Sequence, residues 1–222
     1  MCFYLMPVCF LLAAVYMHFE LKKQYVPAVI LKGLASLTFV IFGIAGSSLC
    51  KDQRFAKLVV IGLILGAVAD VLLNLRYVFA KVGKQIFLFG ILVFLGGHVF
   101  YLAALIPLCK NPVVYILAGL AATCLLMIWI LRKITAEKAF KIFGVVYAGT
   151  ITVMNFVTLG ALIADPCERS YLFFAGAVLF LISDIVLIFN TFGKESKDSL
   201  RITNLALYYV GQILIALSLQ FG

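Results

Sequence analysis

Charged residues are scarce in this chain: only 12% of its 222 residues are Asp, Glu, Lys or Arg, whereas 65% are hydrophobic. A soluble domain is roughly a quarter charged and about half apolar. So few charges cannot cover a water-exposed surface, which excludes a soluble globular protein. The net charge of +9 is no nucleic-acid-binding signal either. The basic residues stand between apolar runs, where they orient a membrane protein and meet lipid headgroups.

Other residue types are too few, or wrongly placed, for several kinds of functional site. The only two histidines, His18 and His98, lie in different apolar runs, so a zinc site of three or four ligands would also need aspartates. No serine stands in a Gly-x-Ser-x-Gly pattern, and no phosphate-binding loop occurs. Six cysteines in so long and apolar a chain do not form the disulfide framework of a small secreted domain. We therefore expect neither a metal nor a cofactor.

Eight apolar runs approach or exceed the roughly 20 residues that a transmembrane helix needs. We predict spans at about 2–19, 26–49, 58–75, 86–108, 113–131, 139–164, 171–192 and 202–222. The first run lacks a basic leader and a cleavage site, so it is interpreted as a span rather than a signal peptide. No intervening stretch is long enough for a separate domain. The expected fold is an all-α polytopic membrane bundle of about eight helices, forming one transmembrane domain over residues 1–222.

The distribution of basic residues predicts an orientation in the membrane. The loops after the odd-numbered spans hold twelve Lys and Arg residues, and those after the even-numbered spans hold five. By the positive-inside rule the first set is cytoplasmic, and both termini are non-cytoplasmic. The membrane itself, bacterial inner membrane or endoplasmic reticulum, stays open. Cys50, Cys109 and Cys167 would lie at the outer face, where a disulfide between two of them also stays open.

An internal repeat is indicated by a shift of 114 residues. Three pairs of residues are related by this shift: Asp70 and Asp184, His98 and Gln212, and Gly62 and Gly176. The shift would place the third and fourth spans over the seventh and eighth. Each half would then hold four helices in the same orientation, a 4+4 parallel repeat of the kind found in some membrane proteins.

Few ionisable side chains lie inside the predicted spans: Lys32, Asp70, His98 and Asp184. A charge near the bilayer centre costs on the order of 3 kcal/mol, so such a residue normally faces the bundle interior and marks a functional site. Their depths allow all four to meet in one cavity, at the midplane or in its cytoplasmic half. Six polar side chains without a charge are further candidates for substrate binding: Asn74, Tyr101, Asn155, Ser183, Tyr208 and Gln212. The alternative for each of them is a structural hydrogen bond between helices.

Helical spacing supports polar faces that point inward. Asp70 and Asn74 are four residues apart, as are Tyr208 and Gln212, so each pair shares one face of its helix. A pair of carboxylates with a histidine is a general acid–base set, and a cation near one carboxylate stabilises its ionised form.

Five segments together resemble a known family. They are Leu31-Lys32-Gly33, residues 66–73 with Asp70, residues 94–101 with His98, residues 176–184 with Asp184, and residues 208–212 with Gln212. In this order, and over nearly the whole chain, they are similar to the YhhN-type lysoplasmalogenases. Gly33 stands where the family usually has proline, and Ala69 where it usually has glycine; neither difference removes a titratable group.

The resemblance implies hydrolysis of the vinyl ether of a lysophospholipid, the lysoplasmalogen, to a fatty aldehyde and a glycerophospho-alcohol. Asp70 and Asp184 would share the acid and base roles, with the assignment between them open. His98 would shuttle a proton or position water, and Lys32 would hold the substrate phosphate. A proton-coupled transporter, a lipid-binding membrane protein and a purely structural membrane protein are the alternatives that the same polar residues allow.

Overall fold

The computed structural model describes residues 3–222, and every regular element in that range is helical. Three single turns of 3₁₀ helix, Ala80–Val82, Ile106–Leu108 and Leu219–Phe221, adjoin the long helices. The α-helices are α1 (Leu5–Leu21), α2 (Tyr25–Ser47), α3 (Gln53–Val78), α4 (Gly83–Leu105), α5 (Pro112–Leu131), α6 (Lys138–Ala164), α7 (Glu168–Phe192) and α8 (Asp198–Ser218). The predicted all-α bundle is confirmed. Among the described helices, seven are long and apolar enough to cross a membrane, and α1, with 17 residues, is shorter.

The helices extend beyond the predicted apolar runs into charged residues. Helix α3 begins at Gln53 rather than at residue 58, because the Asp52 side chain accepts a hydrogen bond from the Phe55 amide at 3.0 Å and so caps the helix. Helix α1 continues through Glu20, which the sequence placed in a loop. The start of the first predicted span, Cys2, lies outside the described residues.

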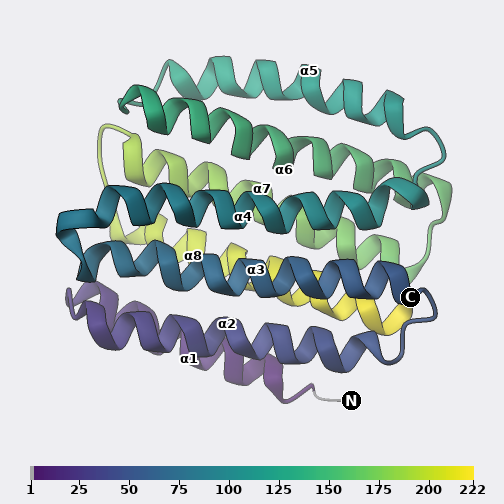
Figure 1. Ribbon diagram of the computed structural model, residues 1–222, viewed down its shortest axis with the longest axis horizontal. Helices are drawn as coiled ribbons and strands as arrows, with labels where there is room; N and C mark the ends of the chain where they lie inside the picture. The colour runs from purple at the N-terminus through teal and green to yellow at the C-terminus, as the bar shows by residue number, and fades with distance from the viewer. Residues whose placement is uncertain (1–2) are drawn as a thin grey trace.

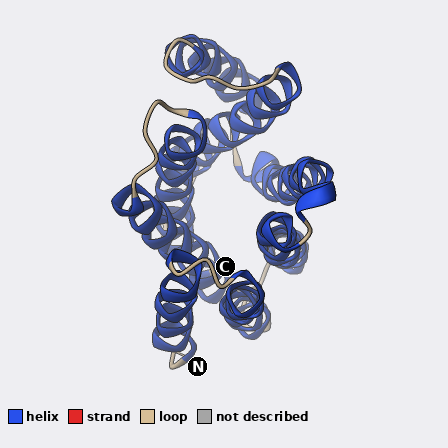
Figure 2. Ribbon diagram, turned by 90° about the vertical axis from the view of Figure 1, so that its left-hand side faces the viewer, coloured by secondary structure: helices blue, strands red, loops and turns tan. Residues whose placement is uncertain are grey.

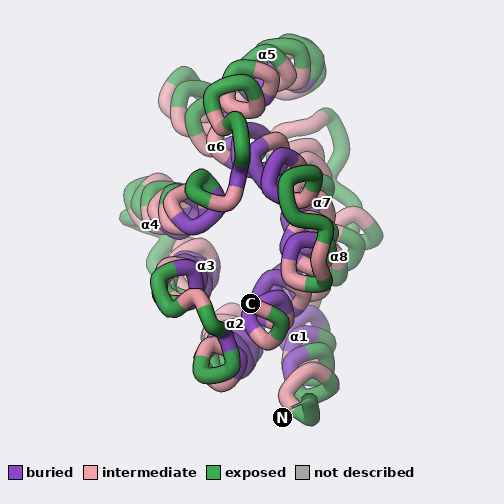
Figure 3. The backbone as a smooth tube through the Cα atoms, turned by 90° about the vertical axis from the view of Figure 1, so that its right-hand side faces the viewer, coloured by how far each residue is buried: buried purple, intermediate pink, exposed green. Residues whose placement is uncertain are grey.

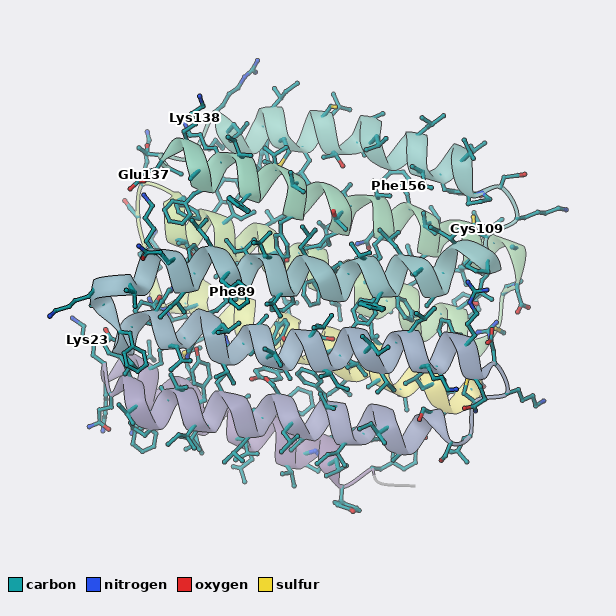
Figure 4. All side chains as sticks on the ribbon, in the orientation of Figure 1. Lys23, Phe89, Cys109, Glu137, Lys138 and Phe156 are labelled. Atoms are coloured by element: carbon teal, nitrogen blue, oxygen red, sulfur yellow. The ribbon has the colours of Figure 1, made fainter. Side chains whose placement is uncertain are left out.

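Short connections make successive helices antiparallel, so the bundle has two ends (Figure 1). One end of the bundle, here called the basic end, holds the connections 22–24, 79–82, 132–137 and 193–197. Figure 4 shows Lys23, Glu137 and Lys138 there, and Cys109 at the opposite end. Lys84 and Glu137 form an ion pair that joins α4 to the start of α6.

Six helices form a closed ring, seen along the bundle in Figures 2 and 3. The order is α2, α3, α4, α6, α7 and α8, and α8 packs back on α2. Helix α1 packs outside against α2 and α8, whereas α5 packs on α6. Buried positions face the ring interior, which is where polar groups from several helices can meet.

The same 114-residue shift relates the contacts of the two helix pairs in this ring. A Cβ on Gly62 would overlap the Tyr101 ring and lie 3.0 Å from the Gly97 carbonyl oxygen. The corresponding contacts occur in the second pair, in which a Cβ on Gly176 would meet Gly211 and Ile215. Glycine lets the α3–α4 and α7–α8 backbones approach closely. Because three contacting positions in each half obey one shift, the structure supports the 4+4 parallel repeat.

Candidate functional site

A cavity of about 270 Å³ lies inside the ring and reaches the basic end. Every helix except α5 contributes to its wall, and the loop before α8 completes it. Its lining comprises Tyr16, Met17, Glu20, Lys32, Asp70, Leu73, Asn74, Arg76, Tyr77, Phe87, Phe94, Tyr147, Asp184, Leu187, Asn190, Thr191, Ser196, Arg201, Asn204, Leu205 and Tyr208. Three carboxylates, one lysine and two arginines are therefore combined with apolar and aromatic walls, as expected of a site for a small organic molecule.

Asp70, on α3, has more ionic and hydrogen-bonding partners than Asp184. It is only 2% exposed. Lys32 Nζ on α2 lies 3.3 Å from its Oδ1. Two hydroxyls donate to its Oδ2: Ser36 Oγ at 2.5 Å and the Tyr208 hydroxyl at 2.7 Å. A charged partner and two donors together stabilise an ionised carboxylate.

Asp184, on α7, has a much poorer set of partners. It is 5% exposed and accepts one hydrogen bond, from the Tyr147 hydroxyl on α6, at 2.7 Å. Among residues 3–222, no Lys, Arg or His lies within ion-pair distance of it. The two aspartates occupy equivalent positions in the repeat and line the same cavity, yet only Asp70 is paired with a cation.

A polar chain extends from this ion pair along the cavity wall. Lys32 Nζ also donates to Asn74 Oδ1 at 3.4 Å. Tyr16 donates to Glu20 Oε2 at 2.6 Å and lies 3.5 Å from the same Asn74 oxygen. Glu20 is only 6% exposed. The side chains of α1 therefore belong to the site, which the sequence did not predict.

Two arginines stand where the cavity meets the basic end. The Arg76 guanidinium lies 4.0 Å from the Phe87 ring centroid and 4.6 Å from that of Tyr77, and it donates to the Tyr77 hydroxyl at 2.6 Å. Its Nε is buried without a hydrogen-bond partner. Within residues 3–222, neither Arg76 nor Arg201 forms an ion pair with a carboxylate. Their charges are available to an anion, which a guanidinium binds through two parallel hydrogen bonds.

His98 is not among the described residues that line the cavity with the two aspartates. It is 1% exposed, and its Nδ1 lies 2.9 Å from the Phe94 carbonyl oxygen. Because a carbonyl only accepts, Nδ1 donates and the buried Nε2 has no hydrogen-bond partner. The rings of Phe180 and Tyr147 pack against it, with centroids at 4.7 and 5.7 Å.

The other predicted binding residues divide between the cavity and the helix contacts. Asn74 and Tyr208 line the cavity. Gln212 accepts from the Tyr101 hydroxyl at 3.1 Å and so joins α8 to α4. The remaining two join helices through backbone carbonyls: Ser183 donates to Asn204 O at 3.0 Å, and Asn155 donates to Ala177 O at 3.2 Å.

Ser36 and Tyr147 contact the aspartates directly but were not predicted from the sequence. Ser36 stands one helical turn beyond Lys32, so the same-face rule that linked Asp70 to Asn74 could have found it. Tyr147 precedes Asp184 by 37 residues and carries no charge, so no local pattern marks it. The described cysteines, including the three predicted outer ones, are free thiols.

Taken together, the long apolar helices and their ring define a polytopic membrane protein, and two buried aspartates from different helices line its cavity. The YhhN family model matches residues 27–219. The chain therefore belongs to the YhhN family, and the family suspected from the five segments is confirmed. No curated protein and no solved structure matches it.

Proposed function

We propose that this protein hydrolyses the vinyl ether bond of lysoplasmalogens, releasing a fatty aldehyde and a glycerophospho-alcohol. The observation that carries the proposal is the unequal carboxylate pair. Asp70 and Asp184 line one cavity, and only Asp70 has a cationic partner. Membership of the YhhN family is consistent with hydrolysis.

The unequal environments suggest how the two aspartates divide the chemistry. Burial without a cation favours the neutral carboxyl, which makes Asp184 the proton donor. Lys32 and two hydroxyls stabilise Asp70 as the carboxylate. Asp184 would protonate the alkene carbon that is not bonded to oxygen, and an oxocarbenium ion would form at the carbon that is bonded to oxygen. Asp70 would stabilise this cation and take a proton from the attacking water, as in glycoside hydrolysis.

The hemiacetal then collapses and restores both carboxyl groups. Asp184, now ionised, takes the hemiacetal hydroxyl proton, and Asp70 gives its proton to the departing glycerol oxygen. The carbon–oxygen bond breaks, so water and the vinyl ether become an aldehyde and an alcohol. No step needs an oxidant or a reductant. The role expected of His98 as a proton shuttle stays a prediction.

The headgroup phosphate is proposed to lie at Arg76 and Arg201 rather than at Lys32, because Lys32 already pairs with Asp70. The arginines stand at the basic end of the cavity. With the basic loops in the cytoplasm and both termini on the other side, the cavity would open to the cytoplasmic leaflet.

The test is aldehyde release from an alkenyl lysophosphatidylethanolamine by purified protein in detergent. We expect Asp70→Asn and Asp184→Asn each to lower kcat by roughly 10²–10⁴-fold. Asp165→Asn, a change at an exposed carboxylate of the opposite end, should leave kcat unchanged. The saturated alkyl ether analogue should not react. Near wild-type turnover in both cavity variants would overturn the mechanism, and flux across sealed vesicles without aldehyde release would favour a carrier.

A further inference from the structure

A second hollow lies between α1 and α8, and every described residue that lines it is apolar or aromatic. It has a volume of about 290 Å³. Three alanines, Ala13 and Ala14 of α1 and Ala206 of α8, contribute to its lining. Such small side chains leave a gap between two neighbouring helices rather than fill it. We call this hollow the α1–α8 groove.

The groove adjoins the ring cavity. Met17 and Leu205 line both. Tyr209 links them further, because its ring lines the groove while its hydroxyl lies 3.3 Å from Ser36 Oγ. Ser36 in turn donates to Asp70. Met17, Leu205 and Tyr209 therefore stand between the groove and the carboxylate site.

The outer side of the groove faces the surroundings of the bundle. Ala14 and Ala206 are exposed residues on two apolar helices. A hydrocarbon chain could thus enter sideways from the bilayer, without passing the arginine-lined opening of the ring cavity, here called the mouth. The mouth, with Arg76 and Arg201, would accept the polar part of the same molecule.

We propose that the α1–α8 groove binds the single hydrocarbon chain of the substrate. The proposal rests on the proposed function and extends it to chain recognition. In a vinyl ether lysolipid the chain begins at the reacting double bond, so its site must adjoin the acid–base pair. The groove meets this requirement, and the arginines receive the phosphate on the other side of the scissile bond.

The test fills the groove with a large side chain. The variants are Ala206→Trp and Ala14→Trp, with Ala206→Leu as a milder change. Because both alanines are exposed, the substitutions do not enter the packed core. The matched control is Ala121→Trp, at an exposed alanine of α5, on the far side of the bundle from α1.

Two measurements are made on each variant. The first is direct binding of a non-hydrolysable lysolipid with a hexadecyl ether chain, which should weaken at least tenfold in the groove variants and not in Ala121→Trp. The second is the ratio of kcat/KM for long-chain over short-chain alkenyl substrates, which should fall at least tenfold. Unchanged binding in the well-folded Ala206→Trp and Ala206→Leu variants would overturn the proposal and leave the groove to ordinary bilayer lipid. Absence of aldehyde release by the wild type would overturn the proposed function alone, because the binding measurement does not depend on turnover.

Discussion

The Lys32–Asp70 ion pair makes a prediction about stability that does not depend on any activity. Nζ and Oδ1 are 3.3 Å apart, and the two side chains are 12% and 3% exposed. Two unit charges at this distance attract by about 5 kcal/mol at an effective dielectric constant of about 20. Removing one partner of a buried pair leaves the other uncompensated, at a cost of roughly 3–5 kcal/mol. We expect Asp70→Asn to lower the free energy of unfolding by about 3 kcal/mol.

Asp184→Asn is the matched comparison at the equivalent position of the repeat. Asparagine keeps an oxygen that can accept from Tyr147, and no buried cation is left alone. The expected loss is below about 1 kcal/mol, the net worth of one hydrogen bond. For a chain of this size, 1 kcal/mol corresponds to roughly 2–4 °C in Tm. The melting temperature should therefore fall by about 6–12 °C in Asp70→Asn and by less than about 4 °C in Asp184→Asn.

The assay is thermal unfolding of the purified variants in one detergent at pH 7. Lys32→Met and the double variant Lys32→Met/Asp70→Asn complete a mutant cycle. The double variant should lose at least about 1 kcal/mol less than the sum of the single losses, because it leaves no unpaired charge. Additive losses, or an Asp184→Asn loss equal to that of Asp70→Asn, would refute the assignment of the cation to Asp70 alone.

Two further predictions follow from close contacts. Gly176→Ala should lower Tm by several degrees, because the added Cβ would lie 2.7 Å from the Gly211 carbonyl oxygen and overpacking costs typically about 1–3 kcal/mol. The control is Gly144→Ala, where a Cβ would have no neighbour within 4 Å. Thermal unfolding of this control should give an unchanged or slightly higher Tm. Tyr147→Phe should lower kcat for vinyl ether cleavage about fivefold with little change in KM. The reason is that it removes the hydrogen bond from Tyr147 to Asp184, which is worth about 1 kcal/mol. A steady-state analysis that shows a raised KM at unchanged kcat would contradict a positioning role for Tyr147.

The helical architecture could be predicted from the sequence because the bilayer leaves few alternatives. Backbone polar groups in lipid must be paired within the segment, so an apolar run of sufficient length becomes a helix. Exposing a charge to lipid is costly, so Lys32, Asp70 and Asp184 could be predicted to face the bundle interior. Helix ends were less predictable, because Glu20 and Asp52 are charged and yet belong to helix α1 and to the cap of α3.

The membership of the cavity was harder to predict, because it depends on how each helix is rotated about its axis. Tyr101 donates to Gln212 and His98 packs against Phe180, so neither residue is among those that line the cavity with the aspartates. That outcome follows from packing between distant helices, which a spacing rule within one helix does not contain. Tyr147 reaches Asp184 through the same kind of distant packing.

The repeat explains why Asp70 and Asp184 line the same cavity, and the positions where the two halves differ explain why these carboxylates have different partners. Tyr208 donates across the ring to Asp70. The residue 114 positions before Tyr208 is Phe94, which has no hydroxyl to offer Asp184. The second half of the repeat therefore lacks the hydrogen bond that the first half receives.

The same comparison applies to the cation. Lys32 pairs with Asp70, but the residue 114 positions after it is Val146, which is 52% exposed. A symmetric protein would give both aspartates the same partners and thus the same proton affinity, and two equal groups divide acid and base roles poorly. Placing the lysine in one half only makes the carboxylates unequal while the repeat keeps them at equivalent positions. The symmetry thus accounts for where the carboxylates lie, and the departures from it for the separate roles proposed for them.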